Sequence, residues 1–305
     1  MSGVDEVHDD PYSALLEPDV EDGHWAFGGG WDDPLEGLDA AVPEGIDAAA
    51  LASYCLALGD DALVLAQRLQ QWCARAPELE EEVALANVAL DLLGQTRLLY
   101  ARAAAADPGL VDRLAPGVPA GSPVPGEDRL AFFRDPADFR CDVLMTLPDA
   151  DFAHAVVRLA AVSLGRVRLW HGLAASPDPV LAAVAGRAVK EVAYHRDHAV
   201  GWVRVLAGGT DESRRRTGEA WIAVTPWVGR PDLAAAALPG VVPDPGTLAA
   251  ETRSDWLRLG EECDLSASSP DVSAYDGRAG RHAPWLAELL EELQSLARQH
   301  PEGRW

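Results

Sequence analysis

Carboxylate, amide and imidazole side chains recur at helical spacing in two segments of the chain. Asn87, Asp91 and Gln95 are four residues apart, and so are Glu191 and His195. Residues four apart lie on the same face of an α-helix, so each segment offers a short row of polar groups to one neighbour. Carboxylate and imidazole together suit iron or manganese. The pattern therefore raises the question of a metal site between helices.

The spacing of a complete di-iron site is not met. Carboxylate-bridged di-iron bundles use an inward Glu from each of two helices and a Glu-x-x-His from each of the other two. Here Asp91 has Gly94 three residues later, and Glu191 has Tyr194 at that position. Segment 152–176, which we predict to be helical, contains neither Asp nor Glu. One helix of the bundle therefore has no carboxylate to contribute.

Helix one offers only two acids near its middle, Asp60 and Asp61. We expect Asp61 to flank its apolar seam and Asp60 to point away. Two interpretations stay open. In the first, Asp61, Asp91, Glu191 and His195 hold a single metal ion. In the second, a metal site has been lost and its polar core, satisfied by hydrogen bonds and arginines, remains. That core comprises Asp61, Asn87, Asp91, Gln95, Glu191 and His195.

Two helical hairpins are predicted to position these groups. Apolar residues spaced alternately four and three apart predict a helix from Asp47 to near Ala76, and Pro77 suits the first turn of the next helix, which ends near Ala106. The Pro- and Gly-rich stretch 107–126 predicts a crossover. A third helix over 151–175 and a fourth ending at Gly208 complete the set. Two antiparallel hairpins joined by a long crossover predict an all-α, ferritin-like four-helix bundle. Additional C-terminal helices are expected near 211–228, 246–263 and 283–299.

Charge separates the first residues from the rest. Of the net charge of −24, residues 1–48 contribute −14, because they hold 14 acids and no Lys or Arg. We predict a disordered acidic tail over 1–46 and one helical domain over 47–305. The strong negative field argues against nucleic acid and anionic membranes as partners. Four scattered cysteines without metal or disulfide spacing favour free thiols, and we expect a cytoplasmic protein.

Specific strings then become recognisable along residues 50–305. They include LDLLGQTR at 90–97, a Tyr-His pair at 194–195, and shorter matches at 56–60, 63–69, 72–73, 76–80, 85–87, 130–132, 134–135, 190–191, 201–202, 208, 210–211, 244–245 and 305. Together they resemble the C subunits of bacterial phenylacetyl-CoA epoxidase, the multicomponent monooxygenase of aerobic phenylacetate degradation. The acidic tail and the 107–126 loop are longer than that family leads us to expect.

The resemblance implies a ferritin-like structural subunit with a degenerate di-iron site and no cofactor of its own. The implied partners are a catalytic di-iron A subunit, a small B subunit, and a reductase that uses NADPH, flavin and an iron-sulfur centre. Phenylacetyl-CoA would bind mainly to the A subunit. The resemblance also implies that the acyl-CoA site borrows residues from Asp138, Phe139, Arg140 and Cys141, of which only Phe139 matches a family position.

Three functions follow from these observations. The first is a non-catalytic scaffold for a catalytic partner. The second is a stand-alone ferritin-like metalloenzyme that uses Asp61, Asp91, Glu191 and His195. The third is a free-standing binding protein with an apolar cavity in its bundle. Metal content separates the first two functions, and co-purification with a di-iron homologue separates the first from the third.

Overall fold

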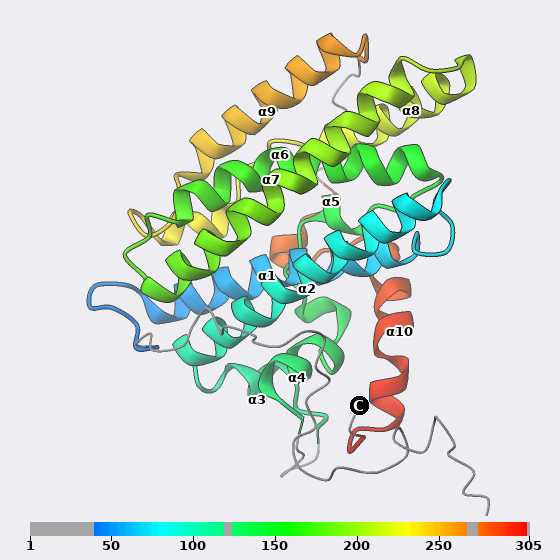
Figure 1. Cartoon of the computed structure of the whole chain (residues 1–305). Helices are drawn as coiled ribbons and strands as arrows, with labels where there is room; N and C mark the ends of the chain where they lie inside the picture. The colour runs from blue at the N-terminus through cyan, green and yellow to red at the C-terminus, as the bar shows by residue number, and fades with distance from the viewer. Residues whose placement is uncertain (1–39, 119–123, 267–273, 304–305) are drawn as a thin grey trace, which may run out of the picture. The chain divides into compact units, whose positions relative to one another are not determined.

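The computed structural model describes residues 40–118, 124–266 and 274–303, and within these ranges the chain is all-α, without a β-strand. Figure 1 shows the two long hairpins that form the bundle. Their helices are α1 (Ala48–Gln70), α2 (Leu79–Ala106), α6 (Phe152–Leu173) and α7 (Pro179–Ala207). The predicted ferritin-like four-helix bundle is confirmed.

The first hairpin differs from expectation at its turn. Asp47 caps α1 by accepting hydrogen bonds from the backbone N–H groups of Ala49 and Ala50. The helix ends at Gln70, six residues before the predicted Ala76, because the chain turns there to bury Trp72. The indole of Trp72 donates to Asp149 at 3.1 Å. Pro77 consequently lies in the turn and precedes α2, which begins at Leu79.

The second hairpin is capped by aspartates at both starts. Asp151 accepts from the backbone N–H of His154 at the start of α6. Asp178 caps α7 through Leu181 N and also pairs with Arg102 near the end of α2. Both side chains of that pair are almost fully buried. This contact joins the two hairpins at one end of the bundle.

The crossover between the hairpins is built from short helices. These are α3 (Leu110–Leu114), α4 (Gly126–Phe132), the 3₁₀ turn η2 (Pro136–Asp138) and α5 (Val143–Thr146). Residues 40–46, which the sequence placed in the tail, pack on the bundle: Val42 and Ile46 contact the core, and Ala40 O accepts from Arg102 at 2.5 Å. The rest of the predicted tail lies outside the described residues.

The predicted C-terminal helices are present close to their expected positions. They are α8 (Asp211–Val224), α9 (Pro245–Glu262) and α10 (Pro284–Gln299), with 3₁₀ turns η3 (Thr225–Trp227), η4 (Leu233–Ala237) and η5 (Gly277–Ala279) between them. Both α8 and α9 pack against α6, and α10 packs against α4 and α1. Trp221 of α8 and Trp256 of α9 stack with centroids 3.6 Å apart, which ties these two helices together.

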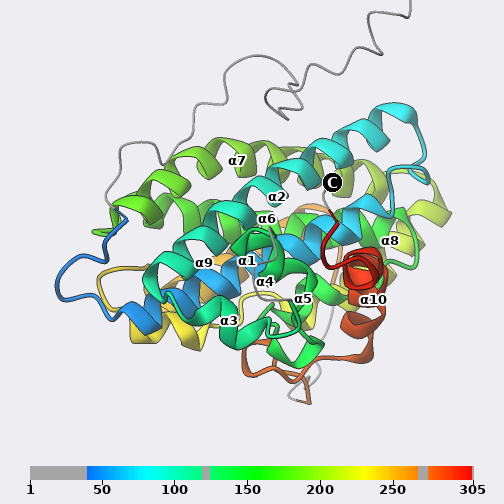
Figure 2. The same ribbon diagram turned by 90° about the horizontal axis from the view of Figure 1, so that it is seen from below.

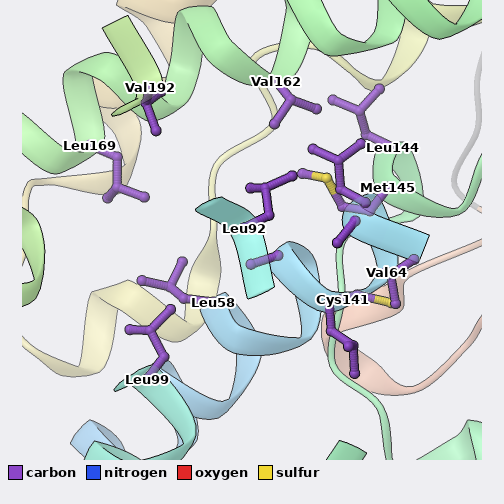
Figure 3. Packing of buried hydrophobic residues seen from close by; sticks show 14 of the residues in the cluster. Leu58, Val64, Leu92, Leu99, Cys141, Leu144, Met145, Val162, Leu169 and Val192 are labelled. Atoms are coloured by element: carbon purple, nitrogen blue, oxygen red, sulfur yellow. The ribbon is translucent and has the colours of Figure 1, made fainter. Parts of the chain in front are cut away.

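The core lies between the two hairpins and the crossover. In Figure 3, Leu58 and Val64 of α1 and Leu92 of α2 lie near Val162 of α6, with Leu144 and Met145 of α5 among them. Within the described ranges α1 is the one helix long and apolar enough to cross a membrane, and most of that apolar stretch is buried inside the protein. Its composition is thus that of a core helix.

Candidate functional site

The contact between α2 and α7 holds the polar pairs that the sequence singled out. His195 is 2% exposed, and its Nε2 lies 3.0 Å from Oδ2 of Asp91, whose side chain is 35% exposed. One turn away, Gln95 Nε2 donates to Oε2 of Glu191 at 3.0 Å. Oε1 of Glu191 accepts from Arg187 Nε at 2.9 Å. These four predicted residues thus pair across two helices and leave no carboxylate without a partner.

Another pair at the same contact was missed from the sequence. Glu81 Oε2 of α2 lies 3.2 Å from His198 Nε2 of α7, and both side chains are largely buried. His198 stood on the predicted seam of its helix, but Glu81 is one of three consecutive acids at a helix start. Nothing in that run singles out the member that faces a neighbour. Asn87, in contrast, is exposed and takes no part in this contact.

Asp61 lies elsewhere, among arginines. Its Oδ2 accepts from Arg166 of α6 at 2.6 Å and from Arg278 of η5 at 2.7 Å. Its Oδ1 accepts from Arg278 at 2.9 Å and from the backbone N–H of Asp142 at 2.6 Å. The carboxylate is 2% exposed. Two guanidinium groups therefore occupy the surroundings in which a metal ion would have to sit.

The expectation that Asp60 points away from the core is wrong. Asp60 is fully buried and pairs with Arg134, which is also fully buried. It accepts hydrogen bonds from the hydroxyl of Tyr100 at 2.6 Å and from the backbone N–H of Arg140 at 2.6 Å. The crossover segment covers this side of α1, and helical periodicity alone does not reveal such a cover. Gly59 permits the arrangement, because a Cβ there would lie 2.6 Å from the Tyr100 ring.

The residues present do not fit a metal centre. Across the part of the chain that the structure describes, no three His, Cys, Asp or Glu side chains gather where they could hold an ion. The six residues predicted as one polar core divide into the α2–α7 pairs, the separately paired Asp61, and the exposed Asn87. The ligand set of the metalloenzyme alternative is therefore not assembled.

The segment implied to contact acyl-CoA is partly inside the protein. Phe139 and Cys141 are fully buried, and the Arg134 guanidinium lies 4.0 Å from the Phe139 ring centroid. Burial raises the pKa of the Cys141 thiol, so it stays protonated. Asp138 and Arg140 keep partial exposure. A ligand that reached this segment would meet those two side chains.

Comparison with known proteins agrees with this architecture. The family model described as "Phenylacetic acid catabolic protein" matches residues 39–305. A curated relative from Escherichia coli (strain K12), the C subunit of 1,2-phenylacetyl-CoA epoxidase, is 34% identical over 262 residues. That match covers 84% of this chain and 99% of the relative. The similarity spans the whole bundle and the C-terminal helices.

Proposed function

The chain belongs to the phenylacetic acid catabolic protein family, and we propose that it is a non-catalytic structural subunit of a multicomponent di-iron monooxygenase. The proposed complex epoxidises the ring of phenylacetyl-CoA in aerobic phenylacetate degradation. The substrate and the reaction are carried over from the relative in Escherichia coli. The structural role is argued from this chain's own residues.

The observation that carries the proposal is the pairing of the polar groups within the bundle. Asp61 is held by Arg166 and Arg278, and His195 is held by Asp91. A carboxylate engaged by two guanidinium groups is a poor ligand for a cation, because the positive charges repel the ion. These contacts stabilise the fold and supply no chemistry.

A docking face for the partner is available on the outer side of α2 and α7. Figure 2 shows these two helices side by side along one edge of the described structure. Leu79, Val83 and Leu90 of α2 are 70%, 53% and 63% exposed, and Tyr194 of α7 is 53% exposed. Leu79, Val83 and Leu90 share one face of α2 by their spacing, and exposed apolar groups gathered on one face mark protein–protein contacts. We call these four residues the outer face and assign it to the partner.

The other parts of the proposed complex are those that the family resemblance implies. The di-iron centre and most of the phenylacetyl-CoA site belong to a catalytic A subunit. A small B subunit and a reductase with NADPH, flavin and iron-sulfur centres complete the assembly. The cytoplasm is the proposed compartment, consistent with four free cysteines in the described residues.

Co-expression with the A subunit tests this proposal. Leu90→Asp places a charge on the outer face and should abolish co-elution, since a desolvated unpaired charge is strongly unfavourable in an interface. Ile222→Asp is the matched control, because Ile222 is 55% exposed on α8, away from that face. The control variant should co-elute as the wild type does. Equal binding by both variants would refute the assignment of the face.

A further inference from the structure

A groove of about 530 Å³ lies between α4 and the second half of α10. Its walls are mainly apolar, and the largest side chains in them are Phe132, Phe133, Leu293 and Leu296. Leu296 is 53% exposed, which is high for a leucine beside two phenylalanines. An engineered apolar cavity of roughly 150 Å³ holds one benzene molecule, so this groove has room for a larger aromatic side chain.

The chain turns back toward this groove after α10. The backbone N–H of Gly303 donates to the carbonyl oxygen of His300 at 2.9 Å, which closes a turn at the end of the helix. His300 and Gly303 both line the groove. Arg304 and Trp305 follow Gly303 directly. Because two extended residues span at most about 7 Å, the backbone of Trp305 stays within that distance of a residue in the groove wall.

The charges at the groove favour these two residues over other aromatic segments of the chain. Asp128 lines the groove and forms no ion pair within the described ranges, and Arg97, which partly offsets its charge, lies 3.7 Å from Glu127. Arg304 would bring a positive charge to these acids. The aromatic residues near the start of the chain would instead bring the net charge of −14 that residues 1–48 carry, which the same acids repel.

The helix that forms one wall of the groove also holds the crossover in place. Gln294 is 4% exposed and donates to the carbonyl oxygens of Ala131 at 3.0 Å and Arg134 at 3.1 Å. Arg298 donates to the same oxygen of Arg134 at 2.7 Å. Arg134 is in turn the buried partner of Asp60. A side chain packed between α4 and α10 would therefore stabilise the crossover where it covers α1.

We propose that Arg304 and Trp305 fold back into this groove and fasten α10 to the crossover. The Trp305 indole packs against Phe133 and Leu296. The Arg304 guanidinium pairs with Asp128. This inference concerns contacts within one chain and does not depend on the proposed complex.

Urea unfolding of the full-length chain tests the proposal. Trp305→Ala should lower the midpoint by about 0.5 M, because the groove loses the ring that it buried. In a Leu296→Ala background the same substitution should lower the midpoint by less than half as much, since side chains in contact are not additive in their effects. Leu257→Ala is the matched control background, because Leu257 is 48% exposed on α9 and does not line the groove.

The control background should show the full wild-type shift for Trp305→Ala. An unchanged midpoint in Trp305→Ala would overturn the proposal. Additive shifts of Trp305→Ala and Leu296→Ala would overturn it as well, because the two side chains would then not be in contact.

A second measurement locates the indole directly. The full-length chain would be labelled with 5-fluorotryptophan, and the ¹⁹F resonance that is missing in Trp305→Phe belongs to Trp305. This resonance should be nearly the same in H₂O and D₂O, as for a buried ring, and Leu296→Ala should move it while Leu257→Ala should not. A resonance with the solvent dependence of an exposed ring would overturn the proposal. A resonance that changed with protein concentration would also overturn it, since the indole would then occupy the groove of a second copy.

Discussion

Replacing Asp61 with Asn tests whether the arginine-held carboxylate is part of the fold. The side chain accepts four hydrogen bonds, three from Arg166 and Arg278 and one from the backbone N–H of Asp142. Asn keeps the shape but removes the charge, and its amide N–H₂ would face a guanidinium donor. Breaking a buried ion pair from one side costs about 3–5 kcal/mol, because the remaining charge stays buried without compensation.

Urea unfolding followed by far-ultraviolet circular dichroism measures this loss. The midpoint should fall while the slope stays constant, which assigns the change to stability. Asp197→Asn is the control, because Asp197 is 69% exposed and its pair with Arg196 is at the surface. It should change the free energy of unfolding by less than about 1 kcal/mol. A loss below about 1 kcal/mol in Asp61→Asn would refute the reasoning, since the carboxylate would then not be compensating two buried cations.

Three further outcomes are expected. His195→Ala should lower the free energy of unfolding by about 1–3 kcal/mol through loss of the Asp91 contact. A complex reconstituted with a saturating amount of this variant chain should nevertheless keep most of its turnover. A thousandfold fall in the turnover of a fully assembled complex would contradict this expectation. Burial lowers the pKa of His282, so the folded state binds its proton more weakly than the unfolded state. Stability should therefore fall as pH drops below about 6.5, and in His282→Gln this loss should be smaller in urea titrations across that range; an unchanged pH dependence would count against it. Removal of residues 1–39 should leave a folded chain that still co-elutes with its partner on size exclusion. Removal of residues 1–46 should in addition lower the stability, because Val42 and Ile46 pack on the core. If the chain without residues 1–39 folded but no longer bound its partner, docking would depend on those residues, with Trp25, Phe27 and Trp31 as the candidates.

The long helices could be predicted because the spacing of apolar residues that favours a helix is a local property of the sequence. Helical patterns in the sequence predicted α1, α2, α6 and α7 close to their observed ranges except at the end of α1, and Pro and Gly marked the crossover. The turn after α1 was misplaced by six residues because burial of Trp72, a tertiary effect, ends that helix early. The spacing of apolar residues does not show whether burial of the Trp72 side chain stabilises the fold more than a further turn of α1 would.

The candidate site was predictable only where both partners lie on regular helices. Asp91, Gln95, Glu191 and His195 were recognised from spacing and do meet across α2 and α7. The burial of Asp60 depends on Arg134 from the crossover, 74 residues away.

The guanidinium groups around Asp61 have the same kind of origin. Arg278 comes from a 3₁₀ turn 217 residues beyond Asp61 in the sequence. Neither the Asp60–Arg134 pair nor the Asp61–Arg278 pair produces a periodic pattern in the sequence. Sequence spacing therefore suggested that a metal site was incomplete, and only the fold showed which cations surround Asp61.

The metal content of the separated subunits tests the central claim most directly. The chain and its A-type partner would be co-expressed in iron-supplemented cells, separated, and measured by elemental analysis per mole of each chain. We expect about two irons in the partner and less than about 0.1 in this chain, because Asp61 is held by arginines and His195 by Asp91. One or two tightly held irons per molecule of this chain would contradict the account and favour the metalloenzyme alternative.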